Sequence, residues 1–339
     1  MRLLILGVAV AALLAVSVAG GASASPVAVK CALWAAPFGS DTNPGTQVAP
    51  FLTIGKLALT LTPGQTGCLA AGTTFAKREV ITGVGSPTGR ITITTPPGGA
   101  PAVLADGIET TQATRFLTLT NLVIRALGGH GSQAVSGTVV LRGYSPALTH
   151  SDVGPGNLAN VGRSCVVLDH AGAALVDRNV LHNCNGASPG LYSAGVLAAT
   201  SVRAHISNNV IFGNAGGDAL AFAPNAQLSL ASRNLMVDNL GGIYFGGAST
   251  VASRDNMIEW NMFALDERFD VHGSHRPNAP QGVGNVVRLN CIFSPRAKTA
   301  SGTGFTMGAN RKVHLHFVKA NGTYRLAPTS PCRDYRPLP

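Results

Sequence analysis

The stretch NVIFGNAGGDALAF (residues 209–222) decides the fold, because its pattern returns along the chain. In NLMVDNLGGIYF (residues 234–245), an Asn is again followed by two apolar residues, a second Asn five places on, Gly-Gly and another apolar run. Three further segments have the same pair of positions: 179–184, 256–261 and 285–290. In the segment 179–184, Cys184 stands where the others have their second Asn. The first Asn recurs at intervals of 30, 25, 22 and 29 residues, so the chain carries an internal repeat.

A repeat of this length predicts a solenoid in which each repeat forms one coil. The apolar runs are three to six residues long, rich in Val, Ile, Leu and Phe, and bounded by Gly and Asn. Such runs are typical of β-strands, and they lack the 3.6-residue stripes and the caps of helical repeats. We therefore predict an all-β solenoid.

The paired asparagines are predicted to form a structural ladder at the corners of the coils. Asn tolerates the left-handed backbone region, and its side chain satisfies nearby backbone groups. Amides stacked on successive coils can bond to one another, so that a buried polar row is satisfied internally. A role as sugar or metal ligands is the less favoured alternative. The expected ladder comprises Asn179, Asn209, Asn214, Asn234, Asn239, Asn256, Asn261, Asn285 and Asn290.

Composition narrows the class of protein and of partner. The chain has 339 residues, of which 45% are hydrophobic and 12% charged, and this excludes extended disorder and coiled coil. Lys and Arg outnumber Asp and Glu by 25 to 15, giving a net charge of +10. Such an excess of positive charge favours polyanionic partners, namely an acidic polysaccharide or cell-wall polymer. The alternative is that the charge only keeps the protein soluble. Only the net charge would support a nucleic-acid partner, so we expect none.

Residues 1–24 have the pattern of a secretory signal peptide. Arg2 is followed by an apolar stretch over residues 3–18 and by the small residues Ala22-Ser23-Ala24. We expect a secreted protein that has no membrane span once this segment is removed, with a single-span anchor as the alternative. Export to an oxidising space makes disulfides the natural state of the cysteines, which form no CxxC pair. Pairing of nearest neighbours in sequence, one of 15 possible arrangements, is our hypothesis: Cys31 with Cys68, Cys165 with Cys184, and Cys291 with Cys332.

Three parts of the chain resemble a known family. FGSDTNPGTQVAPFLTIGKLALTLTPGQTGCLAAGTTF (residues 38–75) looks like the family's N-terminal segment, and NGTYRLAPTSPC (residues 321–332) is similar to its closing segment. Together with the Asn ladder, they resemble the secreted right-handed parallel β-helix proteins of the pectin-lyase-like superfamily. The resemblance implies a single-stranded right-handed parallel β-helix with a short capping helix over residues 52–61, needed to cover the open end of the first coil.

On this plan, the signal peptide at 1–24 is followed by an N-terminal cap with the first coils at 25–112. The main β-helix covers 113–318 and a closing segment 319–339, and we expect a monomer. Clear early strands are expected at 90–95 and 116–124. A stretch rich in Gly, Asn and Pro, residues 149–163, is expected to leave the solenoid as a loop.

The resemblance also implies carbohydrate chemistry. Lyases of this kind use a Lys or Arg base, with calcium held by carboxylates, whereas glycosidases use paired carboxylates. No stacked pair of carboxylates is visible, and Lys is absent between Lys77 and Lys298. Catalytic residues are therefore not assigned, and calcium remains a candidate cofactor.

The densest polar cluster is DERFDVHGSHR (residues 266–276), where the repeat lengthens from 22 to 29 residues and an inserted loop is expected. Its carboxylates are candidate calcium ligands and its histidines candidate proton shuttles, but a polar surface loop is the plain alternative. Two arginines that precede ladder asparagines are expected two coils apart, facing a polymer or simply solvent. The candidate substrate-binding residues are Asp266, Glu267, Arg268, Asp270, His272, His275, Arg276, Arg178 and Arg233.

Two hypotheses about function follow. In the first, a secreted β-helix protein binds an acidic polysaccharide and cleaves it by β-elimination. In the alternative, the protein is a non-catalytic surface adhesin or polysaccharide-binding module. The scarcity of clustered carboxylates and the long stretch without Lys favour the second, whereas the resemblance and the polar cluster favour the first.

Overall fold

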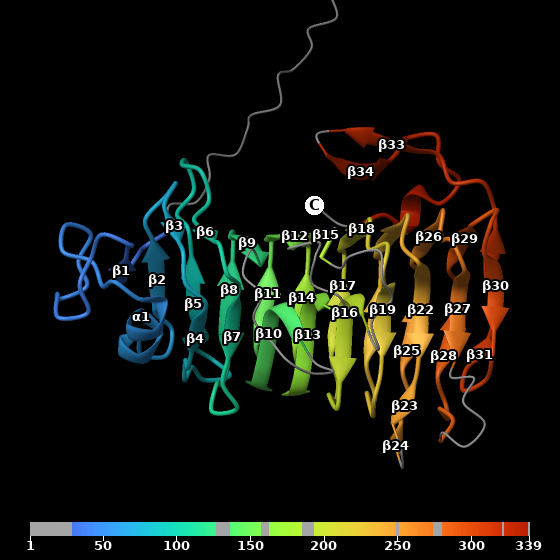
Figure 1. Ribbon diagram of the computed structural model, residues 1–339, viewed down its shortest axis with the longest axis horizontal. Coiled ribbons are helices and arrows are strands. Elements are labelled where there is room, and N and C mark those ends of the chain that lie inside the picture. The colour runs from blue at the N-terminus through green and yellow to red at the C-terminus, as the bar shows by residue number, and fades with distance from the viewer. Residues whose placement is uncertain are drawn as a thin grey trace, which may run out of the picture.

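The structure is a computed structural model that describes residues 29–126, 136–156, 163–184, 193–248, 251–273, 280–320 and 322–337. The described chain winds as a right-handed single-stranded parallel β-helix, as predicted, with its strands side by side along the long axis (Figure 1). Residues 1–24 lie outside the described residues. No helix in the described part is long and apolar enough to cross a membrane.

Three parallel sheets run along the described coils, here named A, B and C. Sheet A has 11 strands: β1 Leu33–Ala35, β2 Thr66–Leu69, β5 Ile91–Thr94, β8 Leu117–Thr120, β11 Ala147–Thr149, β14 Leu175–Asp177, β17 His205–Ser207, β20 Leu230–Ser232, β25 Met257–Glu259, β28 Val286–Arg288 and β31 Thr306–Met307. Sheet B has 10 strands: β3 Thr74–Phe75, β6 Val103–Leu104, β9 Val123–Ala126, β12 Asp152–Gly156, β15 Val180–His182, β18 Val210–Phe212, β21 Leu235–Val237, β26 Met262–Ala264, β29 Cys291–Phe293 and β32 Arg311–Lys312. Sheet C has nine strands: β4 Glu79–Ile81, β7 Ile108–Thr110, β10 Ser136–Tyr144, β13 Arg163–Gly172, β16 Ala194–Ala199, β19 Asp218–Phe222, β22 Gly241–Phe245, β27 Phe269–Gly273 and β30 Lys298–Ser301. Two antiparallel hairpins stand apart from them: β23 Gly247–Ala248 with β24 Val251–Ala252, and β33 Phe317–Ala320 with β34 Thr323–Leu326.

The core consists of rows in which each coil contributes one side chain. Because the strands pair in register, the central residue of each sheet A strand stacks on that of the next coil. Burying an aliphatic side chain of this kind contributes about 1.5–3 kcal/mol, so the row holds the coils together along its length. The fully buried row in sheet A is Ile93, Leu119, Leu148, Val176, Ile206, Ala231, Ile258 and Val287.

The predicted capping helix is present as α1, Ile54–Thr60, at the N-terminal end of the solenoid (Figure 1). The Thr53 side chain caps it by accepting a hydrogen bond from the Lys56 backbone N at 3.0 Å. Its apolar residues Ile54, Leu57 and Ala58 are buried against the first coils. The helix therefore covers core that would otherwise be open to water.

One amide ladder connects sheets A and B along the coils. Each of its amides uses both hydrogens: Asn209 donates from Nδ2 to Asn234 Oδ1 and to the Val176 carbonyl, both at 2.9 Å. Its Oδ1 accepts from the backbone N and the Nδ2 of Asn179, both at 3.0 Å. The buried amide is thereby fully satisfied. The ladder comprises Asn179, Asn209, Asn234, Asn261, Asn290 and Asn310.

The prediction placed Asn256 and Asn285 in the wrong column. Asn256 Nδ2 donates to Asn285 Oδ1 at 2.8 Å in a separate column, at the corner that precedes the sheet A strand of each coil. In the preceding coil, Ser229 occupies this corner, and its backbone N donates to Asn256 Oδ1. Asn214 and Asn239 form a third column after sheet B. In these coils the strands of sheet A and of sheet B are both three residues long, as in β25 and β18. Two asparagines five residues apart can therefore flank a strand of either sheet, and the sequence alone does not tell which.

The residue before each ladder Asn from Asn179 to Asn290 adopts the left-handed conformation, with φ between 55° and 61°. These residues form an outward row of Arg178, Asn208, Arg233, Trp260 and Leu289. Trp260 fills this position in the coil of Asn261. The left-handed residue turns the chain from one sheet to the next.

Two early expectations were also wrong in detail. Residues 116–124 do not form one strand, since Asn121 has φ 53° and separates β8 from β9. Residues 149–163 are not one loop, because β12 is paired with β9 and β15 on either side. A sequence rich in Gly and Pro still forms a strand here, since neighbouring coils supply its hydrogen bonds. Of that stretch, residues 157–162 lie outside the described residues.

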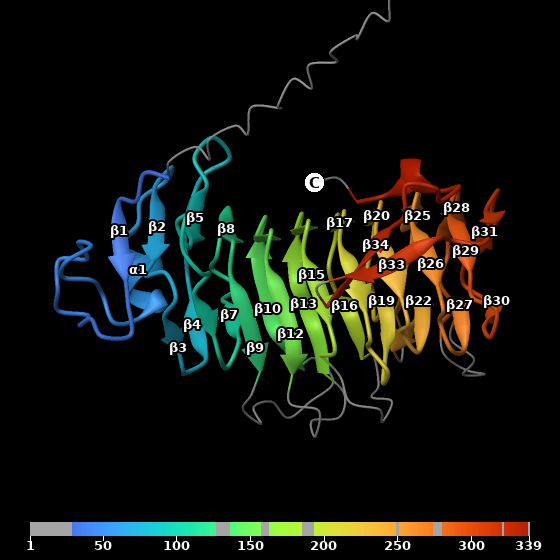
Figure 2. The ribbon, with the colours of Figure 1, turned by 90° about the horizontal axis from the view of Figure 1, so that it is seen from above.

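The C-terminal residues fold back over the coils. The β33–β34 hairpin lies against β18, where the Tyr324 and Phe212 rings are 5.2 Å apart (Figure 2). Beyond it lies the short helix η1, Arg333–Tyr335, and Arg233 donates to the Asp334 carbonyl at 3.0 Å. The three predicted disulfides are confirmed, and one of them joins β29 to this segment: Cys31–Cys68, Cys165–Cys184 and Cys291–Cys332.

Two residues of the predicted substrate-binding loop lie inside the solenoid instead. Asp266 follows Asn239 in the third column, and Asp270 points inward from β27; they are 0% and 1% exposed. Burial raises the pKa of Asp266 well above its usual range, and the negative charge of Asp270 adds to this effect. Burial also raises the pKa of Asp270 to about 7. The expected inserted loop is thus a corner followed by a strand, up to Gly273.

We expect Asn234→Ala to destabilise the fold by about 2–4 kcal/mol, because it leaves the backbone N and the Nδ2 of Asn209 without their acceptor. Thermal unfolding followed by circular dichroism measures the effect. Gln47→Ala, which removes an exposed amide, is the control and should leave the melting temperature unchanged. Equal melting temperatures for the two variants would contradict the ladder's role.

We expect Asp270→Asn to stabilise the protein at pH 8 and to have little effect at pH 3.5. The folded state holds the Asp270 proton up to a pKa of about 7, whereas the unfolded chain releases it near 3.8. The wild type therefore loses stability as the pH rises between these values, and the amide does not titrate. Melting temperatures across this range test the prediction; a gain that is greatest at low pH would refute it.

Candidate functional site

The outer face of sheet C carries the most distinctive arrangement of polar and apolar side chains in the described part. The register brings one outward residue per coil into a straight line, here named the outer row. It is polar at both ends and apolar in the middle. The outer row runs Glu109, Val140, Val167, Leu197, Ala221, Tyr244 and His272.

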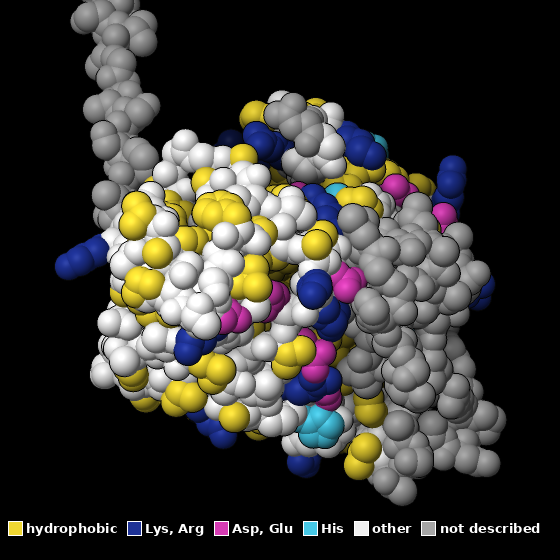
Figure 3. All heavy atoms as spheres, turned by 60° about the vertical axis from the view of Figure 1, so that its left-hand side comes forward, with side chains coloured by type: hydrophobic (Ala, Val, Ile, Leu, Met, Phe, Trp, Pro, Cys, Tyr) yellow, Lys and Arg dark blue, Asp and Glu magenta, His cyan; other side chains and the backbone are white. Residues whose placement is uncertain are grey.

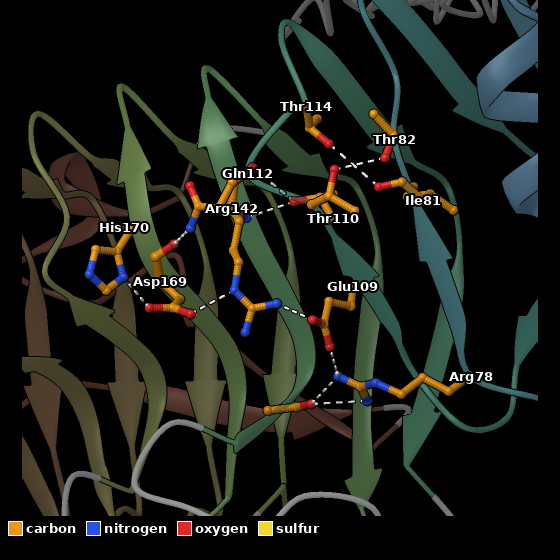
Figure 4. A network of polar contacts seen from close by, with 12 residues as sticks. Arg78, Ile81, Thr82, Glu109, Thr110, Gln112, Thr114, Arg142, Asp169 and His170 are labelled. Atoms are coloured by element: carbon orange, nitrogen blue, oxygen red, sulfur yellow. Dashed lines mark hydrogen bonds and ion pairs between the residues drawn. The ribbon is translucent and has the colours of Figure 1, made fainter.

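At the N-terminal end, a chain of ion pairs crosses the strands (Figure 4). Arg142 lies between two acids, since its Nε is 2.6 Å from Asp169 Oδ2 and its Nη1 contacts Glu109 Oε1. Glu109 Oε2 is 3.3 Å from Arg78 Nη2, and Asp169 Oδ1 is 2.6 Å from His170 Nδ1. These five residues, here named the charged ladder, come from β4, β7, β10 and β13 or directly precede them.

Two arginines and two carboxylates balance within the charged ladder, and their side chains are no more than 26% exposed. Burial alone would lower the pKa of Arg142, but hydrogen bonds and charge from Asp169 and Glu109 outweigh it and raise the pKa. Basic and acidic side chains alternate on this part of the surface (Figure 3). The ladder therefore acts as a rigid support, and only His170, with a side chain 62% exposed, presents its ring to solvent.

A groove of about 370 Å³ lies beside the charged ladder, at the corner between sheets C and A. Tyr144 is 49% exposed in it, and its ring stands edge-on to Phe116 at 5.5 Å. A Cβ on Gly172 would come within 3.0 Å of that ring, so the glycine of the next coil leaves room for it. The groove is lined by Gln112, Arg115, Gly143, Tyr144, His170, Ala171, Gly172, Thr200 and Val202.

Arg115 supplies positive charge to the groove. Its Nη1 donates to the carbonyls of Gln112 and Thr114, at 2.7 and 2.8 Å, and it pairs with no carboxylate among the described residues. Isolated bridges and the β10–β13 pairing connect this corner from coil to coil, from Val84 to Val283, and pass through Arg254, another exposed arginine. The part of this line from Arg115 to Arg254, here named the corner row, consists of Arg115, Tyr144, Gly172, Val202, Gln227 and Arg254.

At the other end of the outer row, His272 joins a second cluster. Its Nε2 lies 2.8 Å from Asp218 Oδ1, and its ring contacts those of Tyr244 and Phe269, with centroids 4.8 and 5.1 Å away. Asp218 and His272 meet across β22 because Gly241 lies between them: a Cβ there would be 2.3 Å from Asp218 Oδ1. His272 is the one residue of the predicted cluster that the described structure places on this face.

The other predicted substrate-binding residues are dispersed. Glu267 and Arg268 are exposed at the corner before β27, and Asp266 and Asp270 lie in the interior. His275 and Arg276 lie outside the described residues. The described part contains no group of three or more His, Cys, Asp or Glu side chains able to hold a metal ion.

The two predicted arginines share the outward row of left-handed residues, two coils apart in the register of β14, β17 and β20. Arg178 pairs with the adjacent Asp177 at 2.5 Å. Arg233 holds the C-terminal segment through the Asp334 carbonyl. Both arginines therefore have partners within the chain. They lie at the corner between sheets A and B, whereas the outer row belongs to sheet C.

Sequence reasoning missed Arg115, Tyr144, Asp218 and the charged ladder. Glu109, Arg142 and Asp169 lie 33 and 27 residues apart, and only the coil register makes them neighbours. The coils that hold them precede the asparagine repeat, so the repeat gave no alignment for them.

No protein-family model matches the sequence, and no curated protein matches it. Among solved structures, the fold is similar to pectate lyase Pel9A, with a TM-score of 0.59 at 11% identity over 89% of this chain and 91% of that chain. It is similar to XylC, solved in complex with xylose, with a TM-score of 0.59 at 11% identity over 85% and 71% of the two chains. A lacto-N-biosidase of Eubacterium ramulus gives a TM-score of 0.50 at 12% identity over 82% and 67%. At such identities the likeness shows a shared architecture: this chain is a right-handed parallel β-helix of the pectin-lyase-like fold.

Proposed function

We propose that this protein is secreted and binds an acidic polysaccharide along the groove and the corner row. The observation that carries the proposal is the groove itself, where an exposed aromatic ring lies beside an arginine that pairs with no carboxylate of the described residues. A sugar ring packs on an aromatic face, and a carboxylate pairs with a guanidinium. The net charge of +10 favours the same polyanionic partner.

The shape of the corner row suits a polymer. Its residues repeat once per coil, about 4.8 Å apart, so equivalent positions recur along the solenoid axis. Arg115 and Arg254 lie toward opposite ends of the row, with the Tyr144 ring and apolar Val202 between them. Two separated charges and an apolar middle support an extended chain better than a compact ligand.

The support beneath the groove is rigid for a physical reason. Arg142 is held by two carboxylates, and Gln112 Nε2 donates to the Asp169 carbonyl at 3.4 Å, linking the groove to the charged ladder. A surface held in place before binding loses less conformational entropy when the ligand binds. We therefore assign the charged ladder a supporting role and the exposed groove residues the contacts.

Secretion is part of the proposal. Three disulfides in a chain of this size fit an oxidising, extracellular environment. The similar folds of a pectate lyase and a lacto-N-biosidase support a carbohydrate ligand without naming it. The signal peptide at residues 1–24 remains a sequence-based expectation.

We expect Tyr144→Ala to weaken binding to polygalacturonate about tenfold, the effect of losing roughly 1.4 kcal/mol of ring contact. Arg115→Ala should weaken binding as well and reduce its dependence on salt, because one exposed ionic contact is removed. Affinity electrophoresis or calorimetry at two salt concentrations measures both effects.

Arg288→Ala is the matched control. This arginine is exposed on sheet A, pairs with Glu259 at 3.1 Å and lies away from the groove. It should leave affinity unchanged. If it weakened binding as much as Arg115→Ala, binding would follow overall charge alone and the groove would not be the site.

A further inference from the structure

The Asp218–His272 cluster is separate from the groove and has the features of a built site. Gly241 of β22 and Gly246 directly after it make room for the cluster: a Cβ on Gly241 would collide with Asp218, and one on Gly246 would lie 2.4 Å from the Tyr244 ring. His272 is held on two sides by aromatic rings, and its side chain is 18% exposed. Its ring orientation is therefore fixed while one edge still reaches solvent.

The hydrogen bond to Asp218 determines which nitrogen of His272 is available. An ionised carboxylate only accepts hydrogen bonds, so the hydrogen lies on His272 Nε2. The neutral imidazole then carries its lone pair on Nδ1. A histidine fixed in this way is a general base, and its partner carboxylate stabilises the imidazolium that forms.

A cation lies on the neighbouring strand. Lys298 of β30 is in register with Phe269, which is in register with Gly241. It is exposed and forms no ion pair with another described residue. The Lys298 backbone thus lies one strand spacing, about 4.8 Å, from that of Phe269, while Ser301 is the β30 residue in register with His272. From this position the long Lys298 side chain can attract a substrate carboxylate.

Resting on the proposed function, we propose that His272, oriented by Asp218, is the acid–base residue of a β-elimination that cleaves the bound polysaccharide, with Lys298 pairing the uronate carboxylate. This differs from the Lys or Arg base and calcium that the family resemblance implies. Hydrolysis suits the cluster poorly, because it requires two carboxyl groups and the cluster contains only Asp218.

The step balances without water or an oxidant. His272 Nδ1 takes the proton from the carbon next to the uronate carboxylate, C5, and the electrons of that C–H bond form a double bond between C5 and C4. The bond from C4 to the glycosidic oxygen breaks, and this oxygen takes a proton from the imidazolium. The products are two shorter chains, one with an unsaturated end, and neutral His272 is restored.

The test follows the absorbance of unsaturated uronate with polygalacturonate and with alginate as substrates, alongside binding to the same polymers. We expect His272→Ala to lower kcat/KM by about 10²–10⁴-fold while binding is retained. Added imidazole should restore part of the turnover. Asp218→Asn, a change in the positioning residue, should lower kcat more than it changes KM.

His182→Ala is the matched control, because His182 also bonds a carboxylate, with Nε2 3.3 Å from Asp152 Oδ1, and stacks on Phe212. It lies on sheet B, so turnover should be unaffected. Circular dichroism checks that each variant folds, and His272→Gln provides a second, more conservative variant.

Turnover by His272→Ala within tenfold of the wild type would overturn the assignment. Polymer binding by the wild type with no unsaturated product from either substrate would also overturn it, leaving the proposed binding function intact. Absence of binding by the wild type would instead refute the proposed function.

Discussion

From Asn179 onward, each coil buries the polar groups of one corner, and the amide ladder makes that possible. An Asn in the interior is tolerated only when its oxygen and both of its hydrogens have partners. Asn209 meets that condition through Asn179 above, Asn234 below and the Val176 carbonyl. Because each amide needs the next one at the same height, the ladder fixes the register of the coils that contain it, from Asn179 to Asn310.

The register in turn builds the outer face of sheet C. In a parallel stack, residues one coil apart in sequence become neighbours in space, about 4.8 Å apart. Arg142 therefore reaches both Glu109 and Asp169, and His272 reaches Asp218 from 54 residues away. The scaffold carries a groove suited to an anionic polymer near β10 and β13 and a histidine suited to proton transfer several coils further on, in β27.

Much of the fold could be predicted from the sequence, because its determinants are local and repeated. The Asn spacing indicated coils, the short amphipathic stretch indicated α1, and the cysteine positions suggested the disulfides. The column of each Asn could not be predicted: the intervals 256–261 and 209–214 look alike, yet only the coil register shows that Asn261, and not Asn256, stacks on Asn234.

The candidate site was harder to predict for a related reason. Dense charge in the sequence drew attention to residues 266–276, although Asp266 and Asp270 point into the core and Glu267 lies at a corner. A charged residue facing inward breaks the usual pattern of burial, and alternation alone does not reveal it. Tyr144 and Asp218 stand in ordinary strands and become distinctive only beside Arg115 and His272.

The account rests on the claim that an acidic polymer lies along sheet C and its corner with sheet A. A crystal structure with a uronate oligosaccharide tests that claim most directly. The account predicts sugar density over Tyr144 and Arg115, running along the solenoid axis toward Tyr244 and His272. An oligosaccharide bound on sheet A or against the β33–β34 hairpin, with the groove empty, would contradict it.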